Sequence, residues 1–351
     1  MKFLHTADWH LGASQHPKIY QEQMLPKLAE MARKYKVDFV LCVGDVFDHT
    51  KPTQQIKDKL LKFIVDNDDI QFIFTVGNHD YVDKARSYHS LKYLKILDKK
   101  VENVSVHEEG WHYFKERDFC LFVLPENFHY NKEEFETFPN CDYVNLVVAC
   151  HGTVPGYEVI GGEATKTSKD FCKKVQRDLG ADYFALGDIH KRVTFSDRCF
   201  YPGTLVQKTF GCEDGLLLVD ISDVVGVKHL RLDLPKKVTL NIEVDENGVT
   251  EEDVTSFVKD EIKDTCFLKL KFILPQTVYA SLDKEYIRNE LKSCVESVVF
   301  DNDPIVEKRS RVGIEKIAKA KSVEEEVYIT IDEDDTILDK KKLKKVCSKY
   351  L

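Results

Sequence analysis

The sequence lacks any hydrophobic run long enough to cross a membrane. No stretch approaches the roughly 18 consecutive apolar residues that a membrane span needs. The first residues, Met1 to Gly12, contain no apolar segment of the kind found in a secretory signal peptide, and they include the charged Asp8. We therefore expect a cytoplasmic protein, of a bacterium or of the host cell of a virus, with no membrane partner.

The cysteines lack the spacing of a disulfide framework or a zinc ribbon. The chain has ten cysteines, and no two of them form a Cys-x-x-Cys pair. Such a scatter is typical of reduced, mostly buried thiols in a cytosolic protein. The sequence therefore favours a fold that is held together by its hydrophobic core and not by covalent links between cysteines.

The chain also lacks an excess of basic residues, since 51 Lys and Arg face 60 Asp and Glu. The formal net charge is −9 at pH 7, which argues against a protein that holds nucleic acid through its overall field, since that binding depends on Lys and Arg contacts with phosphates. Local contacts remain open through three short basic segments, although each is equally typical of a solvated surface. The segments are residues 166–173, Lys191 with Arg192, and residues 308–311.

The N-terminal part of the chain has the pattern of an α/β domain. Short apolar runs, predicted as strands, alternate with amphipathic segments, predicted as helices. The first strands are expected at 2–6, 39–43 and 70–76, and the helices at 19–35 and 56–65. Later strands are expected at 143–150, 182–186, 198–201 and 215–221. With 351 residues, the chain is long enough for this domain, over residues 1–235, and a smaller one.

Beyond the predicted α/β domain the hydrophobic pattern starts again on a smaller scale. Alternating apolar residues predict strands at 238–244 and 268–272. Helical stripes cover residues 254–262 and 287–298. This βαβα pattern favours a small accessory domain over residues 236–322.

The C-terminal tail, residues 323–351, carries two blocks of opposite charge. Residues 324–335 are acidic and residues 340–349 are basic. Four apolar residues could line one face of a short helix that docks on a partner, although a frayed, solvated terminus is an equally open interpretation. They are Leu338, Leu343, Val346 and Tyr350.

Polar residues collect where the predicted strands end. In α/β sheets ligands bind at the carboxyl ends of the strands, so residues that follow strands are candidates for a site. Asp-x-His follows the first strand, Gly-Asp-x-x-Asp the second and Gly-Asn-His-Asp the third, and a histidine and a Gly-Asp-x-His segment follow two later strands. The candidates are Asp8, His10, Asp45, Asp48, Asn78, His79, Asp80, His151, Asp188 and His190.

These residue types suit the hydrolysis of a phosphodiester by two metal ions. Two divalent ions about 3.5 to 4 Å apart generate hydroxide and clamp the phosphate oxygens. The site then needs about seven nitrogen and oxygen ligands, a carboxylate that bridges both ions, and a group that protonates the leaving oxygen. One such motif alone would carry little weight, but five in this order, each at a strand end, are poorly explained by chance.

The order of the motifs resembles that of the calcineurin-like metallophosphoesterases. Several stretches narrow the resemblance to the SbcD-type DNA nuclease subunits of that family. They are residues 3–12, 44–48, 151–156, 182–187, 201–204 and 210–211. The specific motifs cover about residues 1–235, and beyond them only the layout is similar. The resemblance implies an α/β fold, a β-sandwich flanked by helices, with a small α/β capping domain and a C-terminal tail.

The resemblance also implies a role for each candidate residue. One metal would be held by four residues with Asp45 as the bridge, namely Asp8, His10, Asp45 and His190. The second would be completed by Asn78, His151 and Asp188. His79 would be the general acid, Asp80 would orient it, and Asp48 would face the site.

One position departs from the family pattern. The last motif usually reads Gly-His-x-His, whereas this chain has Asp188 where a histidine is expected. A carboxylate at this position would favour harder ions such as manganese or magnesium over zinc. If Asp188 is too short to reach, the second metal would bind weakly and activity would be low.

The remaining histidines fit no metal pattern, and surface or structural roles are expected for them. They are His5, His16, His49, His89, His107, His112, His129 and His229. The apolar side of the helix expected at 19–35, with Met24, Leu28 and Met31, could form a dimer interface, although packing on the sheet is the simpler interpretation.

The function implied by the resemblance is that of a manganese-dependent DNA nuclease, with double-strand exonuclease and single-strand endonuclease activity. It would use two manganese ions, with magnesium as an alternative. It would act as a homodimer within a heterotetramer, with an SbcC-like coiled-coil ATPase of the SMC family, in DNA end processing, repair or recombination.

Two other functions remain open. A general phosphomonoesterase or cyclic-nucleotide phosphodiesterase would use the same ligands, but it would not need the accessory domain and tail. A non-catalytic scaffold on the same fold would bind partners only, but nothing would then require the full ligand set and His79.

Overall fold

The computed structural model of the chain describes most of its 351 residues. The described residues are 1–83, 85–97, 101–126, 144–158, 163–243, 249–274, 276–303, 322, 327–328, 331 and 340–348. The chain forms two compact units. Unit 1 comprises Met1–Thr239, Ile262–Lys269 and Cys294–Ser297, and unit 2 comprises Leu240–Glu261, Leu270–Ser293 and Val298–Leu351.

The first sheet of unit 1 has six strands in the order β12-β11-β1-β2-β3-β4. The strands are β1 (Lys2–Thr6), β2 (Phe39–Val43), β3 (Phe72–Thr75), β4 (Val104–His107), β11 (Leu216–Ile221) and β12 (Val225–Leu230). From β1 to β4 neighbouring strands are parallel, whereas β11 pairs antiparallel with both β1 and β12. The carboxyl ends of β1, β2 and β3 therefore meet at one edge of the sheet.

The second sheet also has six strands, in the order β5-β6-β7-β8-β10-β9. They are β5 (Gly110–Phe114), β6 (Phe119–Val123), β7 (Asn145–His151), β8 (Tyr183–Gly187), β9 (Arg192–Ser196) and β10 (Cys199–Pro202). The four central strands are parallel, and the outer strands β5 and β9 are antiparallel to their neighbours.

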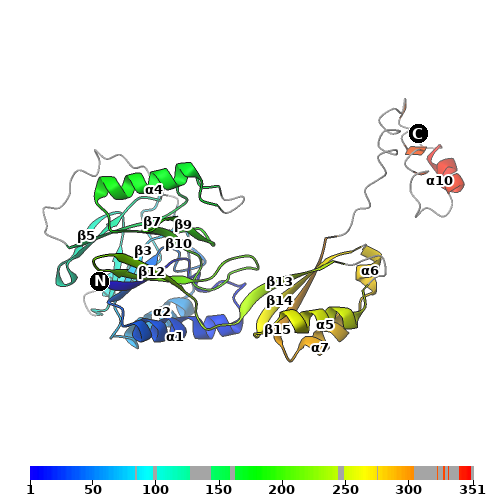
Figure 1. The fold of residues 1–351 in the computed structure, drawn as a ribbon, viewed down its shortest axis with the longest axis horizontal. Helices are drawn as coiled ribbons and strands as arrows, with labels where there is room; N and C mark the ends of the chain where they lie inside the picture. The colour runs from blue at the N-terminus through cyan, green and yellow to red at the C-terminus, as the bar shows by residue number, and fades with distance from the viewer. Residues whose placement is uncertain are drawn as a thin grey trace. The chain divides into compact units, whose positions relative to one another are not determined.

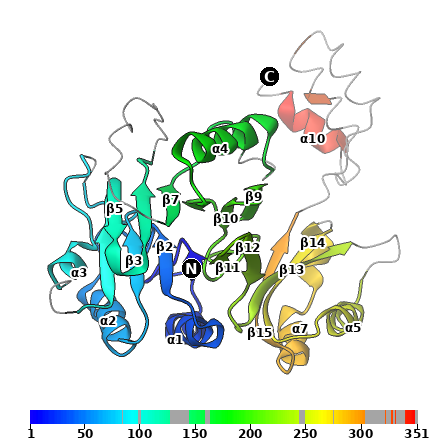
Figure 2. The ribbon, with the colours of Figure 1, turned by 60° about the vertical axis from the view of Figure 1, so that its left-hand side comes forward.

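The two sheets pack face to face with helices on the outer faces, as Figures 1 and 2 show. Aromatic rings cross the interface, with Phe39 of the first sheet stacked on Phe119 of the second at 4.9 Å. Helices α1 (Lys18–Tyr35) and α2 (Gln54–Val65) share a core with the outer face of the first sheet. Helix α4 (Lys166–Leu179) shares one with the second. This arrangement confirms the expected β-sandwich flanked by helices.

Helix α1 is amphipathic, and its apolar side faces the protein interior. Met24 and Leu28 are buried in the core cluster of the first sheet, and the partly buried Met31 packs against it. These residues therefore pack on the sheet, which was the simpler of the two interpretations.

A third sheet has three strands in the order β13-β14-β15, and its residues are divided between unit 1 and unit 2. The strands are β13 (Lys236–Glu243), β14 (Cys266–Ile273) and β15 (Val295–Asn302), and the helices of unit 2 include α5 (Glu251–Glu261), α6 (Gln276–Ser281) and α7 (Lys284–Leu291). Helices α5 and α7 pack against each other.

The prediction of one helical stripe over residues 287–298 was wrong. Helix α7 ends at Leu291, and β15 begins at Val295. Three valines and one phenylalanine make up half of the segment Val295–Asn302, and β-branched and aromatic side chains favour a strand. Residues 295–302 therefore form a strand, which the helical spacing of the apolar residues did not indicate.

Several expectations for the C-terminal part lie outside the described residues. These are the basic segment at 308–311, most of the acidic block, and Leu338 and Tyr350. Within the basic block, α10 (Lys340–Cys347) is helical, with Leu343 and Val346 exposed.

Membrane spans and cysteine links were both predicted to be absent. Within the described ranges, no helix combines the length and the apolar character needed to cross a membrane. The nine described cysteines are free thiols, and six of them are buried, whereas Cys141 lies outside the described residues.

Candidate metal centre

The predicted site residues meet at the carboxyl ends of five strands. Asp8 and His10 follow β1, Asp45 and Asp48 follow β2, and residues 78–80 follow β3. From the second sheet, His151 is the last residue of β7, and Asp188 and His190 follow β8. The site is therefore built from both sheets, and most of its side chains are buried.

The turns that carry these side chains have unusual backbone conformations. Asp8, His10 and Asp45 adopt φ angles of 53°, 44° and 52°, in the left-handed region that L-residues rarely occupy. Gly44 has φ of +76°, and a Cβ atom there would lie 2.3 Å from Nδ1 of His151. Such strain collects at functional sites, where the surrounding fold must hold it in place.

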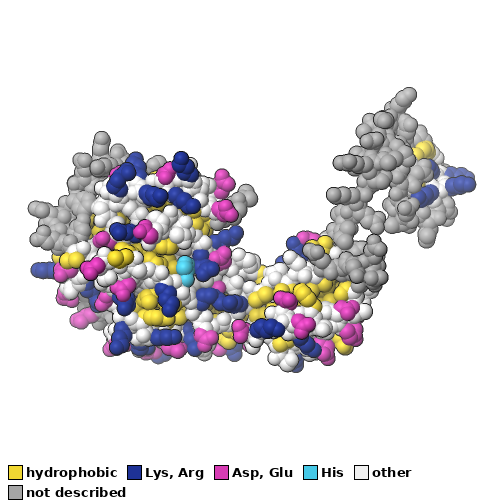
Figure 3. Space-filling model, in the orientation of Figure 1, with side chains coloured by type: hydrophobic (Ala, Val, Ile, Leu, Met, Phe, Trp, Pro, Cys, Tyr) yellow, Lys and Arg dark blue, Asp and Glu magenta, His cyan; other side chains and the backbone are white. Residues whose placement is uncertain are grey.

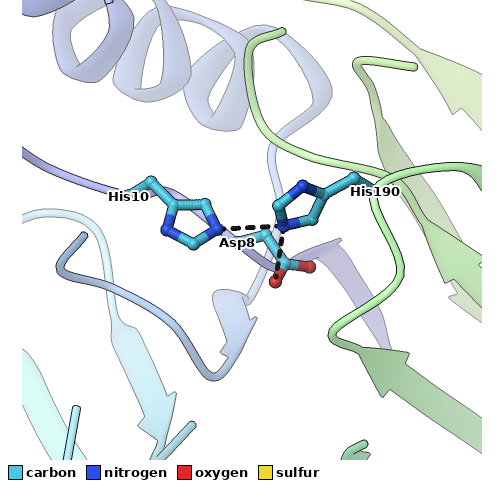
Figure 4. Close-up of side chains that lie close together, drawn as sticks. All are labelled: Asp8, His10 and His190. Atoms are coloured by element: carbon cyan, nitrogen blue, oxygen red, sulfur yellow. Dashed lines mark hydrogen bonds and ion pairs between the residues drawn. The ribbon is translucent and has the colours of Figure 1, made fainter. Parts of the chain in front are cut away.

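Asp8, His10 and His190 form the first group of ligand atoms, shown in Figure 4. The Nε2 atoms of His10 and His190 lie 3.0 Å apart, and His190 Nε2 lies 3.8 Å from Asp8 Oδ1. Among the described residues, buried Asp8 Oδ1 has no hydrogen-bond partner. A buried carboxylate oxygen without a donor, beside two imidazoles, fits a metal ligand.

Asp8, Asp45 and His151 form a second group. His151 Nδ1 lies 2.7 Å from the carbonyl oxygen of Val43 and donates to it, because a carbonyl can only accept. The other ring nitrogen, Nε2, faces Asp45 Oδ1 at 3.2 Å and Asn78 Oδ1 at 3.0 Å. This nitrogen is oriented as a metal ligand would be.

Asp45 lies between the two groups. Its Oδ1 faces His151 Nε2, whereas its Oδ2 lies 4.0 Å from both His10 Nε2 and His79 Nε2. One oxygen is therefore turned to each side. That is the arrangement that a carboxylate shared by two ions requires.

Burial and mutual charge perturb these groups strongly. Burial raises the pKa of Asp8 to about 7 and lowers the pKa of His10 to about 3. Burial would also raise the pKa of Asp45, but the charge and hydrogen bond of His151 lower it below the ordinary value. Divalent cations would compensate several crowded carboxylates at once, so the donor set fits a two-metal centre.

His79 is the most exposed of the central histidines, with 39% of its side chain accessible. Its Nδ1 donates to the carbonyl oxygen of Asp48 at 2.7 Å, which leaves Nε2 on the side of the centre. Buried Asp80 accepts from the backbone N–H groups of Gly77 and Phe47, at 3.0 and 3.2 Å. Asp80 thus joins the turn that carries His79 to the turn after β2.

Asp188 lies at the margin of the centre. Its Oδ1 is 4.0 Å from His151 Nε2, and its Oδ2 accepts from Thr153 Oγ1 at 3.0 Å. It belongs to none of the three groups of His, Cys, Asp or Glu ligand atoms that approach within 4.8 Å of one another in the described chain. Its backbone N–H donates to Asp8 Oδ2 at 3.1 Å, so it contributes to the site through the main chain.

A third group contains His10, Asp48 and His79, and here the structure reveals a residue that sequence reasoning missed. Lys208 Nζ lies 2.6 Å from Asp48 Oδ1. Burial would raise the pKa of Asp48, but the Lys208 ammonium lowers it below the ordinary value. Lys208 lies between two stretches that resemble the family, which was the available signal. The exposed His49, by contrast, only approaches Asp48 Oδ2 at 3.5 Å.

Comparisons with known proteins find relatives of this chain. The SbcD subunit of the nuclease SbcCD from Escherichia coli strain K12 is 33% identical over 87 residues, which cover 23% of this chain and 22% of that protein. The protein of the same name from Bacillus subtilis strain 168 is 30% identical over 90 residues, covering 24% and 23%. The chain thus spans less than a quarter of the length of these curated relatives.

A solved structure titled "GAP50 the anchor in the inner membrane complex of Plasmodium" is also similar. It has a TM-score of 0.43 and 14% sequence identity, and the similarity covers 66% of this chain and 85% of that one. This similarity is too low to bear on the function.

The family is shown by a longer match. The model of the family described as calcineurin-like phosphoesterase matches residues 1–192, and all the candidate ligands lie in that range. This match covers more than half of the 351 residues, so the chain belongs to the calcineurin-like phosphoesterases, a family of hydrolases.

Proposed function

We propose that this chain is a manganese-dependent DNA nuclease that hydrolyses phosphodiester bonds at a two-metal centre. The observation that carries the proposal is the position of Asp45, with one oxygen toward His151 and the other toward His10 and His79. Two manganese ions in such a centre would supply a hydroxide nucleophile and stabilise charge on the phosphate. Magnesium is the alternative ion.

The protein residues divide into two proposed ligand sets. Asp8, His10, Asp45 and His190 would hold one ion, and Asn78, His151 and Asp188 would complete the second, with Asp45 shared. Asp188 lies at the edge of the second set, since its Oδ1 is 4.0 Å from His151 Nε2. An oxygen-rich second site would favour manganese or magnesium over zinc.

His79 is the proposed general acid. Its Nε2 lies on the side of the centre, while Nδ1 is fixed by the carbonyl oxygen of Asp48. A proton on Nε2 would pass to the leaving oxygen of the cleaved strand. The partial exposure of His79 suits a residue that must touch a large substrate.

DNA is the proposed substrate, and support comes from the names of the relatives and from local charge. The acidic chain carries a row of exposed basic side chains on α4, namely Lys166, Lys169, Lys173 and Arg177. Figure 3 shows Lys and Arg side chains gathered over this helix. Such a row could contact backbone phosphates without any global positive charge.

The proposed assembly is a homodimer that works with an SMC-like coiled-coil ATPase in DNA end processing, repair or recombination. The relatives are named as one subunit of the nuclease SbcCD, which indicates a multi-subunit enzyme. The basic α10, with Leu343 and Val346 exposed on it, is a candidate for docking that partner.

The test is cleavage of end-labelled duplex DNA and of single-stranded DNA in manganese, for the wild type and His79→Ala. p-Nitrophenyl phosphate and cyclic nucleotides are assayed in parallel. We expect degradation of DNA by the wild type, and a loss of about 10²-fold or more in the variant, in line with removal of a general acid.

Other outcomes would redirect the assignment. Turnover of the small esters with intact DNA would indicate a general phosphoesterase. Absence of any turnover, even with the ATPase partner added, would indicate a scaffold.

A further inference from the structure

A short line of polar side chains leads from Lys208 into the centre. The Nζ atom of Lys208 lies 2.6 Å from Asp48 Oδ1, and the same oxygen lies 3.2 Å from His10 Nδ1. The side chains are 17%, 5% and 1% exposed, respectively, so water screens these contacts little. The other nitrogen of His10, Nε2, lies 3.0 Å from His190 Nε2.

We propose that Lys208 is a positioning residue of the metal centre, which fixes the carboxylate of Asp48 and thereby holds His10 with Nε2 directed at the metal. The inference rests on the proposed function, because it takes His10 as a ligand. An imidazole that binds metal commonly gives its other N–H to a carboxylate, and that contact sets its tautomer and orientation. Here Asp48 is the carboxylate that faces the other nitrogen, with Oδ1 3.2 Å from Nδ1, although Nδ1 has no partner in hydrogen-bond geometry among the described residues.

Asp48 alone would not fix His10 in one orientation. A carboxylate offers two equivalent oxygens. One of them, Oδ2, lies 3.5 Å from Nε2 of His49, and a rotation of the carboxylate would exchange the two. The ammonium of Lys208 forms an ion pair with Oδ1, which is the oxygen that faces His10. It also compensates the charge of a carboxylate that is only 5% exposed.

Lys208 is itself held in place by its neighbours. Its carbonyl oxygen accepts from Lys237 Nζ at 2.7 Å. The adjacent Gln207 is almost fully buried, accepts from the backbone N–H of Lys237 at 2.6 Å, and donates to the carbonyl oxygen of Cys212 at 2.9 Å. The segment between β10 and β11 is thus fixed on both sides of Lys208, as a positioning role requires.

A role through charge alone predicts the opposite effect on metal binding. An ammonium close to a divalent ion repels it, so its removal would strengthen binding if Lys208 did nothing else. A positioning role predicts weaker binding, because His10 loses its fixed orientation. The direction of the change in manganese affinity therefore separates the two roles.

The experiment measures Mn²⁺ affinity by calorimetry on the full chain, stripped of metal and without DNA. The variants are Lys208→Met, Lys208→Arg, Asp48→Asn and the double variant Lys208→Met with Asp48→Asn. Lys228→Met, at an exposed lysine on β12, controls for the loss of one positive charge. Thermal unfolding of each metal-free variant checks that it is folded.

We expect Lys208→Met to weaken Mn²⁺ binding about tenfold, which is the usual cost of losing a partner of a metal-binding histidine. Lys208→Arg should keep most of the affinity. The double variant should bind no more weakly than Asp48→Asn alone, because Lys208 acts through Asp48.

Three results would overturn the inference: unchanged or tighter binding in Lys208→Met, an equal loss in Lys228→Met, or independent effects of Lys208→Met and Asp48→Asn. If Lys208→Met does not fold, the inference is tested by Asp48→Asn instead. An Mn²⁺ affinity of Asp48→Asn equal to that of the wild type would also overturn it. A wild type that binds Mn²⁺ but cuts neither DNA nor small esters would overturn the proposed function alone. A wild type that cuts DNA, with tight Mn²⁺ binding in Lys208→Met, would overturn this inference alone.

Discussion

His5 shows how one buried side chain links the stability of the fold to pH. It is fully buried in β1, and its Nε2 donates to the carbonyl oxygen of Leu186 at 3.1 Å. Nδ1 then accepts from the Tyr183 hydroxyl at 3.0 Å. Burial lowers the pKa of His5 from 6.5 to about 3, so the folded protein keeps the ring neutral where the unfolded chain would protonate it.

We expect the free energy of unfolding to fall as the pH drops below about 6.5, because the unfolded state then binds a proton that the folded state does not. His5 alone should contribute a loss of roughly 2 kcal/mol by about pH 5. Urea unfolding at a series of pH values measures this slope. His5→Gln keeps a donor and an acceptor but cannot titrate, and an unchanged slope in that variant would exclude His5 as the cause.

Asp188 is the residue at which the ligand set departs from its family. Its Oδ1 is 4.0 Å from His151 Nε2, and the longer imidazole of a histidine would reach further into the centre. We expect Asp188→His to keep manganese-dependent DNA cleavage and Asp188→Ala to lose most of it. Parallel assays in manganese measure both. Complete loss in Asp188→His, or full activity in Asp188→Ala, would argue against a ligand role.

At the scale of single residues, the residues that meet in the candidate centre could be predicted because each lies in a short motif at a strand end. Lys208 could not be predicted in the same way. It contacts Asp48 across 160 positions of sequence, and its place between two stretches that resemble the family is a weak signal beside the motifs of the ligand candidates. Contacts of this kind depend on the path of a loop, which hydrophobic periodicity does not describe.

The turns after the strands are the elements on which the centre depends. Gly44, at the end of β2, combines a left-handed backbone with a close approach to His151. Any side chain there would meet the imidazole that the proposed second metal needs. The geometry of the centre is therefore set partly by the lack of a Cβ atom at this turn.

We expect Gly44→Ala to lower the free energy of unfolding by roughly 2 to 4 kcal/mol and to weaken Mn²⁺ binding, because the added Cβ displaces His151. Gly180→Ala is the matched control. Gly180 has φ of +68°, but a Cβ there would meet nothing within 4 Å. Denaturant unfolding and calorimetry compare the two variants. Equal effects of both on Mn²⁺ affinity would contradict a specific contact with His151.

The elements themselves were predictable to different degrees. Strands β1 and β2 have the predicted bounds, because their apolar runs are bounded by polar turns. The sequence of helix α4 was interpreted only as a basic segment, and no helix was predicted there. Exposed lysines surround its few buried apolar residues, which are Cys172, Val175 and Leu179. The boundary between α7 and β15 was missed because Cys294 and Val298 continue the helical spacing of the apolar residues in α7.

At the scale of unit 1, the centre joins the two sheets. Asp8, His10 and Asp45 come from the first sheet, and His151 and His190 come from the second. Without cations, the buried carboxylates repel one another across this edge. Any ion held by ligands from both sheets therefore stabilises the folded state relative to the unfolded chain.

We expect Mn²⁺ at about 100 times its dissociation constant to stabilise the fold by roughly 2.7 kcal/mol. That corresponds to a rise in the melting temperature of about 5 to 10 °C for a domain of this size. Differential scanning calorimetry with Mn²⁺ and then with excess EDTA measures the shift and its reversal. Asp45→Asn should show little shift. An equal shift in that variant would place the stabilising ion elsewhere.

The spread of the ligands along the chain has a consequence for synthesis. His10 and His190 are 180 positions apart, yet their ring nitrogens lie 3.0 Å from each other. A nascent chain on the ribosome carries Asp8, His10, Asp45 and His79 long before His151 and His190 emerge. The proposed nuclease would therefore remain inert throughout most of its translation, and cutting could start only after the second sheet had been made and folded.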